Sequence, residues 1–337
     1  MKRTSRKTSL GATVLLAAAL FFGVQTVHGV DLAAVEGQWL PPDSAVPITM
    51  WGFIPDPGSC PAGPVAWDLG PAQNGVAGGS LSITLRNCLS EPVSLVIPGQ
   101  HATLTPQTTT DGQGRQRVTS FTAEAAPGGG TATYTWTNLK RGTFLYQSGS
   151  HPAKQMHMGL YGVLKVGQYF GAYSESLVVF SEIDPVLHAT QAAATPLTYK
   201  PRYFLVNGQA YLPGQPPPVL AGARMTKNHL LRLVNAGLMS HTPVIQGPYM
   251  KLVAEDGNPY PYKREQYSVM LAPGKTIDAL WYPDATGDFA LYDRSLSLST
   301  NGAVGGGLLV YVNVDVAPPR FPWEMFIPAI TGMGKLP

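Results

Sequence analysis

Four potential metal donors lie within eight residues of this chain, namely His151, Met156, His157 and Met158. Copper accepts imidazole and thioether ligands, and the softer Cu(I) state favours sulfur, so this group could bind copper. On a continuous helix, at about 100° per residue, His151 and His157 would lie roughly 120° apart and would not converge. Pro152 suits the first turn of a short helix, which would leave His151 free in the preceding loop. A structural role is the alternative, with packed methionines and with histidines bonded to backbone carbonyls.

The only two cysteines, Cys60 and Cys88, bear on the same chemistry. In an exported protein, two cysteines in neighbouring segments usually form a disulfide, and we predict that bond here. A blue-copper centre needs a cysteine thiolate, two histidines and usually a weak axial methionine. Neither cysteine has a histidine nearby in the sequence, and a disulfide would leave no thiolate for such a centre.

The first 29 residues have the pattern of a secretory signal peptide. Basic residues at positions 2–7 precede an apolar stretch over residues 10–24, and Val27 and Gly29 suit a cleavage site. We therefore expect a periplasmic or secreted protein whose mature chain starts near Val30. An uncleaved anchor is the alternative, although the apolar stretch is short for a spanning helix. No later segment has the ~20 apolar residues that a membrane helix needs.

The mature chain is long enough for two domains. Only 13% of the residues are charged and the formal net charge is +3, which disfavours a nucleic-acid-binding face. The 37 glycines and 31 prolines favour short strands joined by many turns. The chain has no glycine-rich phosphate loop, no serine-hydrolase elbow and no zinc-protease motif, so we expect neither a nucleotide-dependent enzyme nor a hydrolase.

The elements that must position the donors are predicted to be strands. Residues 81–86, 131–136 and 308–316 alternate apolar and polar side chains, which is typical of half-buried strands. Residues 142–147 form a further strand that leads into the donor segment. Clear turn signals such as Asp256-Gly257 separate the runs, and no long amphipathic helix is apparent. We expect an all-β protein.

The two halves of the chain resemble each other. Residues 79–87 and 222–235 each run from a glycine through a strand to an asparagine. Each half also has a late proline-glycine turn followed by an aromatic strand. A repeat of this length indicates domain duplication. We therefore predict a first domain over 30–167, a second over 168–316, and a proline- and aromatic-rich tail over 317–337 that docks on its own chain or a neighbour.

Residues 142–162, GTFLYQSGSHPAKQMHMGLYG, resemble the end of the first domain of multicopper oxidases, where a strand ends in W-Y-H-S-H before Q-x-x-x-G-L-x-G. Later segments resemble landmarks of that family's second domain, in the same order: FLVNG at 204–208, LRLVNAG at 231–237, AEDG at 254–257 and LAPGKTID at 271–278. The resemblance covers about residues 46–316. It implies two tandem cupredoxin-like Greek-key β-sandwiches, copper as cofactor, oxidoreductase chemistry with a redox partner, and a homotrimer.

The sequence departs from the family at the copper ligands. The family's first motif, H-W-H-G, falls on Val96-Ile97-Pro98-Gly99, and the histidines of the second motif fall on Gln147 and Gly149. The third domain of the long oxidases, with its H-C-H motif, has no counterpart here. A trinuclear cluster draws on more histidines than the seven of this chain, one of which, His28, lies in the predicted signal. Neither an ordinary laccase nor an ordinary nitrite reductase is expected, and whether the chain is an enzyme stays open.

The remaining histidines extend these alternatives. His241 lies where second domains of the family approach the first, so it could complete a site between domains or subunits, or simply cap a surface loop. His101 follows the vacated first motif and could lie near Gln147. His188 and His229 show no partner in the sequence, and we expect both to be solvated.

Three functional hypotheses follow. The first is an exported protein that binds copper at a non-standard site, with His151, His157 and a methionine and with help from His241 or His101, for copper handling or redox chemistry. The second is a copper-free structural or partner-binding module of the cell envelope or extracellular space. The third is an oxidoreductase that shares copper between the subunits of a trimer.

Overall fold

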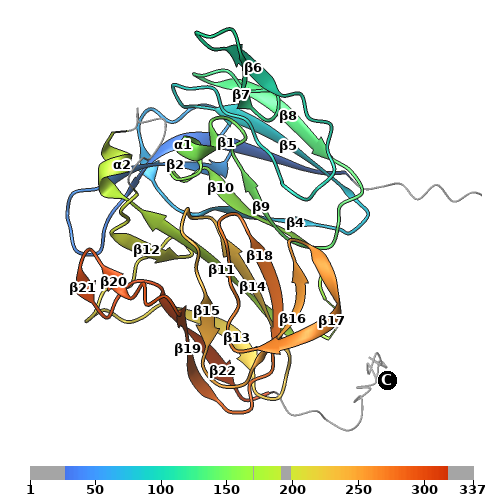
Figure 1. Ribbon diagram of the computed structural model, residues 1–337, viewed down its shortest axis with the longest axis vertical. Helices are drawn as coiled ribbons and strands as arrows, with labels where there is room; N and C mark the ends of the chain where they lie inside the picture. The colour runs from blue at the N-terminus through green and yellow to red at the C-terminus, as the bar shows by residue number, and fades with distance from the viewer. Residues whose placement is uncertain (1–26, 170, 191–198, 318–337) are drawn as a thin grey trace, which may run out of the picture.

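The computed structural model describes residues 27–169, 171–190 and 199–317, and the regular secondary structure of these residues is almost wholly β-strand (Figure 1). The strands of the first half are β1 (Val27–Trp39), β2 (Ile48–Pro55), β3 (Val65–Ala66), β4 (Gly70–Gly75), β5 (Ser80–Asn87), β6 (Gln107–Thr110), β7 (Gln116–Ser120), β8 (Gly130–Trp136), β9 (Gly142–Gln147) and β10 (Tyr161–Val166). Those of the second half are β11 (Ser174–Ile183), β12 (Tyr203–Val206), β13 (Val219–Arg224), β14 (His229–Asn235), β15 (Pro243–Ile245), β16 (Met250–Glu255), β17 (Asn258–Gln266), β18 (Thr276–Trp281), β19 (Gly287–Asp293), β20 (Ser299–Thr300), β21 (Ala303–Val304) and β22 (Leu309–Asp315). The helices α1 (Pro152–Gln155) and α2 (Pro185–Ala189) are about one turn each. The prediction of an all-β chain is confirmed.

Each half forms a sandwich of two sheets. In the first sandwich, a sheet with the order β2-β1-β5-β8, extended by β3, faces a sheet with the order β4-β10-β9. In the second, a sheet with the order β12-β11-β14-β18-β16-β17 faces a sheet with the order β13-β22-β19-β15. The predicted domain junction after Gly167 lies between β10 and β11.

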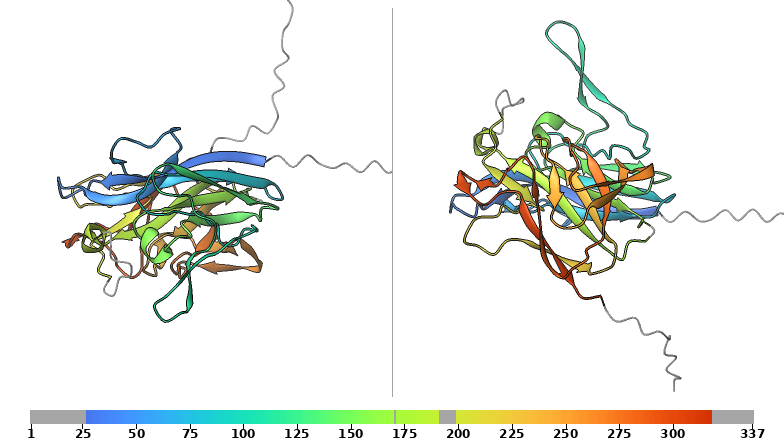
Figure 2. Two further views of the ribbon diagram at one scale, coloured as in Figure 1. Left: turned by 90° about the horizontal axis from the view of Figure 1, so that it is seen from above. Right: turned by 60° about the horizontal axis from the view of Figure 1, so that its bottom comes forward.

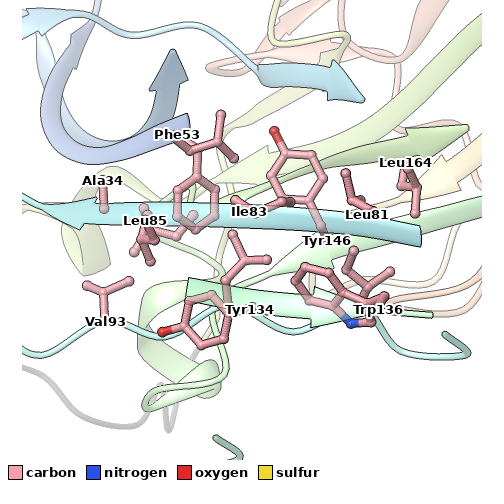
Figure 3. Packing of buried hydrophobic residues seen from close by; sticks show 14 of the residues in the cluster. Ala34, Phe53, Leu81, Ile83, Leu85, Val93, Tyr134, Trp136, Tyr146 and Leu164 are labelled. Carbon is pink, nitrogen blue, oxygen red and sulfur yellow. The ribbon is translucent and has the colours of Figure 1, made fainter. Parts of the chain in front are cut away.

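Alternation along the strands builds the core of the first sandwich. In β5, Leu81, Ile83 and Leu85 are fully buried while the residues between them are partly exposed, because successive side chains of a strand point to opposite faces. Figure 3 shows these three side chains packed with Tyr146 of β9 and with aromatic residues of β8. The alternation that predicted this strand therefore also identified its core-facing side.

A buried asparagine recurs at the same place in each sandwich. Asn87 Nδ2 donates to the carbonyls of Glu91 and Ala125, and Asn87 Oδ1 accepts the amide of Leu89. Asn235 repeats this pattern in the second sandwich, with Met239 O, Leu271 O and the Gly237 amide as partners. Each asparagine ties the end of its strand to the following loop and to a distant segment. The repeated hydrogen-bond pattern supports the predicted duplication.

The two sandwiches pack together over a buried layer that we call the seam. An arginine crosses it: the guanidinium of Arg232, 1% exposed, donates to Thr143 Oγ1 at 3.0 Å and to Gly167 O at 2.9 Å, and it pairs with Glu175 and Asp278. The apolar side chains of the seam come from both halves, as follows: Trp39, Met50, Trp67, Leu145, Tyr161, Val163, Val179, Ile183, Tyr203, Leu205, Val234 and Ala236. The seam therefore combines apolar burial with a paired, hydrogen-bonded charge.

The hairpin β6–β7 stands away from both sandwiches (Figure 2). Its strands form a two-stranded sheet of their own, and most of its residues are exposed. Asp111 orders the turn by accepting bonds from Arg115 and Arg117. At its base, Ser120 pairs with Ser150 just before α1. The sequence analysis did not predict this projecting element.

Parts of the sequence predictions fall outside the described residues. The predicted signal peptide lies there except for Val27–Gly29, which begin β1, and the predicted tail lies there except for Ala317. Within the described part of the chain, no helix is long and apolar enough to cross a membrane.

Candidate functional site

The structure brings the two vacated ligand motifs together. Val96 and Gln147 pair across an antiparallel bridge, with Val96 N to Gln147 O at 2.9 Å and Gln147 N to Val96 O at 3.0 Å. These two positions stand where the family motifs have histidines. The strand pairing therefore keeps the two positions adjacent, although neither side chain is an imidazole or a thiolate.

Next to this bridge, at Gly149, there is neither a copper donor nor room for a larger side chain. A Cβ atom added to Gly149 would lie 2.8 Å from Ser94 Oγ and 2.9 Å from Val96 Cγ1, closer than real Cβ contacts. The buried hydroxyls of Ser94, Ser120 and Ser150 bond to one another at 2.9–3.2 Å, and Ser150 Oγ also donates to Glu124 Oε1 at 2.6 Å. Serine hydroxyls and packed backbone fill the place of the family's second ligand pair, so the residues present do not fit that copper centre.

The predicted donor segment is divided between different surroundings. His151 is exposed and precedes α1 with φ of 38°, so the expectation of a loop histidine before a short helix is confirmed. Met158 is fully buried in the core of the first sandwich, whereas Met156 is partly buried against the seam. His157 is buried with 5% exposure. Of the four donors, Met156 therefore packs on the apolar side chains of the seam, whereas His151 is exposed and Met158 belongs to the core of the first sandwich.

His157 has a partner that the sequence analysis missed. Its ring lies 5.5 Å, centroid to centroid, from the ring of His188 in α2, with the planes at 81°. The prediction that His188 is solvated is wrong, since this side chain is fully buried. Asp184-Pro185 is a signal that could have revealed a short helix, because aspartate caps a helix N-terminus and proline suits its first turn. The pairing itself depends on contact between the sandwiches.

Both rings of this pair are held in one tautomer. His157 Nδ1 lies 2.8 Å from Ala153 O, and His188 Nδ1 lies 2.9 Å from Asp184 O, so each Nδ1–H donates to a carbonyl four residues earlier. Burial lowers the pKa of His157 and lowers that of His188 to about 4. Both rings are therefore neutral at neutral pH, with a lone pair at Nε2. Within the described chain, His188 Nε2 is a buried atom with no hydrogen-bond partner.

The remaining histidines differ from this pair. His229 is fully buried, so its predicted solvation is wrong, and its ring nitrogens bond to Ser174 and Ser176 hydroxyls at 2.8 and 2.9 Å. His101 is exposed, and its carbonyl accepts the amide of Thr137. His229 has no free donor atom for a ligand, whereas His101 lies in open solvent.

His241 lies inside the second sandwich between two carboxylates. Its Nδ1 is 3.1 Å from Asp293 Oδ2, and its Nε2 bonds to Glu182 Oε1. Burial alone would lower the pKa of His241, but hydrogen bonds and charge from Asp293 and Glu182 outweigh it and raise the pKa to about 9. With both nitrogens engaged, the ring acts as a buried cation that joins three segments rather than as a free ligand.

The predicted disulfide is confirmed. Cys60 and Cys88 are bonded, with sulfurs 2.07 Å apart, and the chain contains no other cysteine. A blue-copper centre built on a cysteine thiolate of this chain is thereby excluded. Among the described residues, no group of three or more His, Cys, Asp or Glu side chains is arranged to hold a metal ion.

Comparisons with known proteins agree with this fold. Two family models, both described as multicopper oxidase, match residues 68–169 and 182–313. No curated protein sequence matches the chain. Among solved structures, a blue copper oxidase from Nitrosomonas europaea superposes with a TM-score of 0.69 at 16% identity, covering 86% of each chain.

Two other solved structures show the same arrangement. A copper nitrite reductase from Nitrosomonas europaea gives a TM-score of 0.64 at 19% identity, covering 86% of this chain and 94% of its own. A laccase from Botrytis aclada gives 0.66 at 17% identity, covering 92% of this chain and 55% of its own. At these identities the likeness establishes the fold alone. Together with the two family models, it shows that the chain belongs to the multicopper oxidase family and has two cupredoxin-like domains.

Proposed function

We propose that this chain is an exported copper-handling member of its family, which holds one copper ion per chain and does not reduce oxygen at a multi-copper cluster. The observation that carries the proposal is the bridge between Val96 and Gln147. It keeps the family's ligand positions adjacent, yet valine and glutamine supply no copper donor there, and Gly149 leaves no room for one.

The inventory of free donors supports a single ion. Both ring nitrogens of His229 and of His241 are occupied by hydrogen bonds. The disulfide removes both thiolates. What remains in the family's ligand segment is the exposed His151, the buried His157 and the soft, partly buried thioether of Met156. Imidazole and thioether donors suit copper storage or transfer, since they hold Cu(I) without the larger ligand set of an oxygen-reducing cluster.

When bound, copper would supply a soft, redox-capable ion. The residues of the chain would hold it and exclude water: His157 through its fixed tautomer, and the seam through its apolar side chains. Redox chemistry with a protein partner is compatible with this role, but copper handling requires only binding and release.

The test measures metal content and oxygen consumption of the full mature protein. The protein is loaded with copper, dialysed and analysed by mass spectrometry of the metal, and oxygen uptake is followed with a phenolic reductant beside a laccase control. We expect one copper per chain, no intense blue absorption and no catalytic oxygen uptake. Two or more coppers per chain, or sustained oxygen reduction, would contradict the proposal.

Export and assembly are part of the proposal and need separate measurements. N-terminal sequencing of protein recovered from the export fraction should find a start at Val30, whereas a start at Met1 would indicate a retained anchor. The mass in solution will decide whether the homotrimer implied by the resemblance forms.

A second candidate function is a copper-free, partner-binding module, which the projecting β6–β7 hairpin favours. A lone two-stranded hairpin is marginal in water, so one that stands clear of the fold suits a contact surface. Exposed Leu104, Val118 and Phe121 lie on or beside it. If this candidate is correct, the wild type should take up no copper, and shortening the hairpin to a tight turn should change the mass in solution while leaving thermal stability unchanged.

A further inference from the structure

The turn after α1 and the helix α2 bring one imidazole from each sandwich together. The segment of α1 joins β9 to β10 in the first sandwich, and α2 follows β11 in the second and contacts β2 across the seam. Figure 1 shows both helices on the same side of the molecule. We infer that His157 and His188 form a Cu(I) site that links the two sandwiches through their Nε2 atoms. This inference rests on the proposed copper handling and names the residues that perform it.

Both imidazoles are oriented before any ion arrives. Each Nδ1–H is bound to a carbonyl four residues earlier in its own segment, which fixes the ring and leaves Nε2 as the free donor. Metal-binding histidines usually have this second hydrogen bond, because it sets the tautomer and makes the ligating nitrogen more basic. The same arrangement occurs in two unrelated segments that meet only in the folded protein.

The unpartnered nitrogen of His188 is the observation that points to a ligand. Its Nε2 is fully buried and forms no hydrogen bond of normal distance and angle with any described residue, although the backbone of His157 lies beside the ring. Buried polar atoms are almost always satisfied, so such an atom in a well-packed seam calls for a partner. The ring of His157 lies beside that of His188, and an ion between the two rings would give the Nε2 of His188 a partner.

The spacing of the rings suits a shared ion. With a nitrogen–metal distance of about 2.0 Å, a ring centroid lies roughly 3.2 Å from the ion. The observed 5.5 Å between centroids then corresponds to an angle of about 120° at the ion, provided that both Nε2 atoms face it. That angle leaves room for a third, weaker donor, and the thioether of Met156 is next in sequence to His157.

Charge and softness select Cu(I) over a divalent ion. The two imidazoles are neutral, and Asp184, which is 3% exposed, belongs to none of the ion pairs of the described residues. The carboxylate of Asp184 accepts the amides of Val186 and Lys200 instead of a cation. A single positive charge would balance this carboxylate, whereas a divalent ion would add an uncompensated charge and would also require four ligands.

The experiment titrates the full mature protein with Cu(I) under anaerobic conditions against a chromogenic Cu(I) chelator. The variants are His157→Gln and His188→Gln, and the matched control is His151→Gln, which removes the exposed histidine of the same segment. Circular dichroism and thermal unfolding without metal establish that each variant is folded. We expect one Cu(I) per chain in the wild type and in His151→Gln, with affinity at least 100-fold lower in both seam variants.

Two further readouts depend on the geometry of the site. X-ray absorption of the loaded protein should show two nitrogen neighbours at about 2.0 Å. Cu(I) should raise the melting temperature of the wild type and of His151→Gln but not of the seam variants, because an ion that binds only the folded state stabilises it. If one seam variant is unfolded without metal, the other and the absorption spectrum decide the question.

The possible results of this experiment distinguish the His157–His188 site from the proposed copper-handling function. A wild type that binds no Cu(I) would overturn both the site and copper handling. Binding that persists in both seam variants would overturn the site and leave copper handling in place. Tighter binding of Zn(II) than of Cu(I) would overturn the identity of the ion.

Discussion

The buried cation in the second sandwich gives a pH-dependent prediction for the change His241→Gln. The imidazole joins Glu182 of β11 to Asp293 at the end of β19, and all three side chains are fully buried. Asp293 Oδ1 also accepts the Thr242 amide at 2.7 Å. Removing one partner of a buried ion pair costs about 3–5 kcal/mol, because the charges that remain lose their compensation. We expect a loss of that size in unfolding free energy near pH 6.

The sign of the pH dependence follows from the pKa of His241. This pKa is raised to about 9 from an unfolded value of 6.5, since the bonds and charges of the two carboxylates outweigh the effect of burial. A raised pKa gives stability that is fully present below pH 6.5 and is lost as the pH rises through about 9. The amount is about 3 kcal/mol. The difference between wild type and variant should therefore shrink by that amount between pH 6 and pH 10.

At low pH, the contribution of Asp293 to stability changes with pH in the opposite direction. Burial alone would raise the pKa of Asp293, but bonds from His241, Thr242 and Ser295 lower it to about 2 from 3.8. Its contribution is present above pH 3.8 and is lost as the pH falls through about 2. The raised pKa of His241 and the lowered pKa of Asp293 arise in part from the same ion pair, so their contributions to the unfolding free energy are not added together. The variant should therefore show a weaker loss of stability in acid.

Urea unfolding followed by tryptophan fluorescence from about pH 2 to pH 10 measures these effects. His101→Gln, at an exposed histidine, is the control and should follow the wild-type curve. A difference between wild type and His241→Gln that stays constant with pH, or that grows above pH 8, would refute the assignment of His241 as a buried cation.

Three further predictions concern stability. Replacing both Cys60 and Cys88 by alanine should lower the unfolding free energy by about 2–4 kcal/mol, since the bond spans 28 residues of the unfolded chain; an unchanged urea midpoint would contradict this. Arg232→Met should cost about 3–5 kcal/mol, because it leaves a buried aspartate unpaired at the seam; calorimetry that finds no loss would show the pair to be dispensable. Gly149→His, which restores a family ligand, should cost about 1–3 kcal/mol because its Cβ would meet Ser94 Oγ at 2.8 Å, and a variant with an unchanged melting temperature would show that the space is open.

Much of the fold was readable from local patterns. The strand predicted over residues 142–147 is β9 with the same bounds, and residues 81–86 lie within β5. The loop before α1 was indicated by Pro152, and the disulfide was indicated by the number of cysteines together with the predicted signal peptide. The projecting hairpin β6–β7 escaped prediction because its threonine-rich strands have no apolar alternation.

The candidate site was readable only in part. His157 and Met156 were identified from their types and spacing, but His188 was expected in solvent. No local pattern pairs these two histidines, because His157 follows α1 in the first sandwich whereas His188 lies in α2 of the second. Likewise, nothing near His241 in the sequence indicates that Glu182 and Asp293 enclose it.

The sequence by itself determined the β-architecture, its duplication and the loss of the family's copper ligands. Each of these depends on features of short sequence segments, namely side-chain alternation, turn residues and the types of residue at the ligand positions. The tertiary structure alone decided which histidines meet, which are enclosed by carboxylates and whether a vacated position is open or filled. These properties depend on the packing of one sandwich against the other. A nitrogen atom becomes a free ligand or a satisfied hydrogen-bond donor only when residues distant in sequence are placed around it.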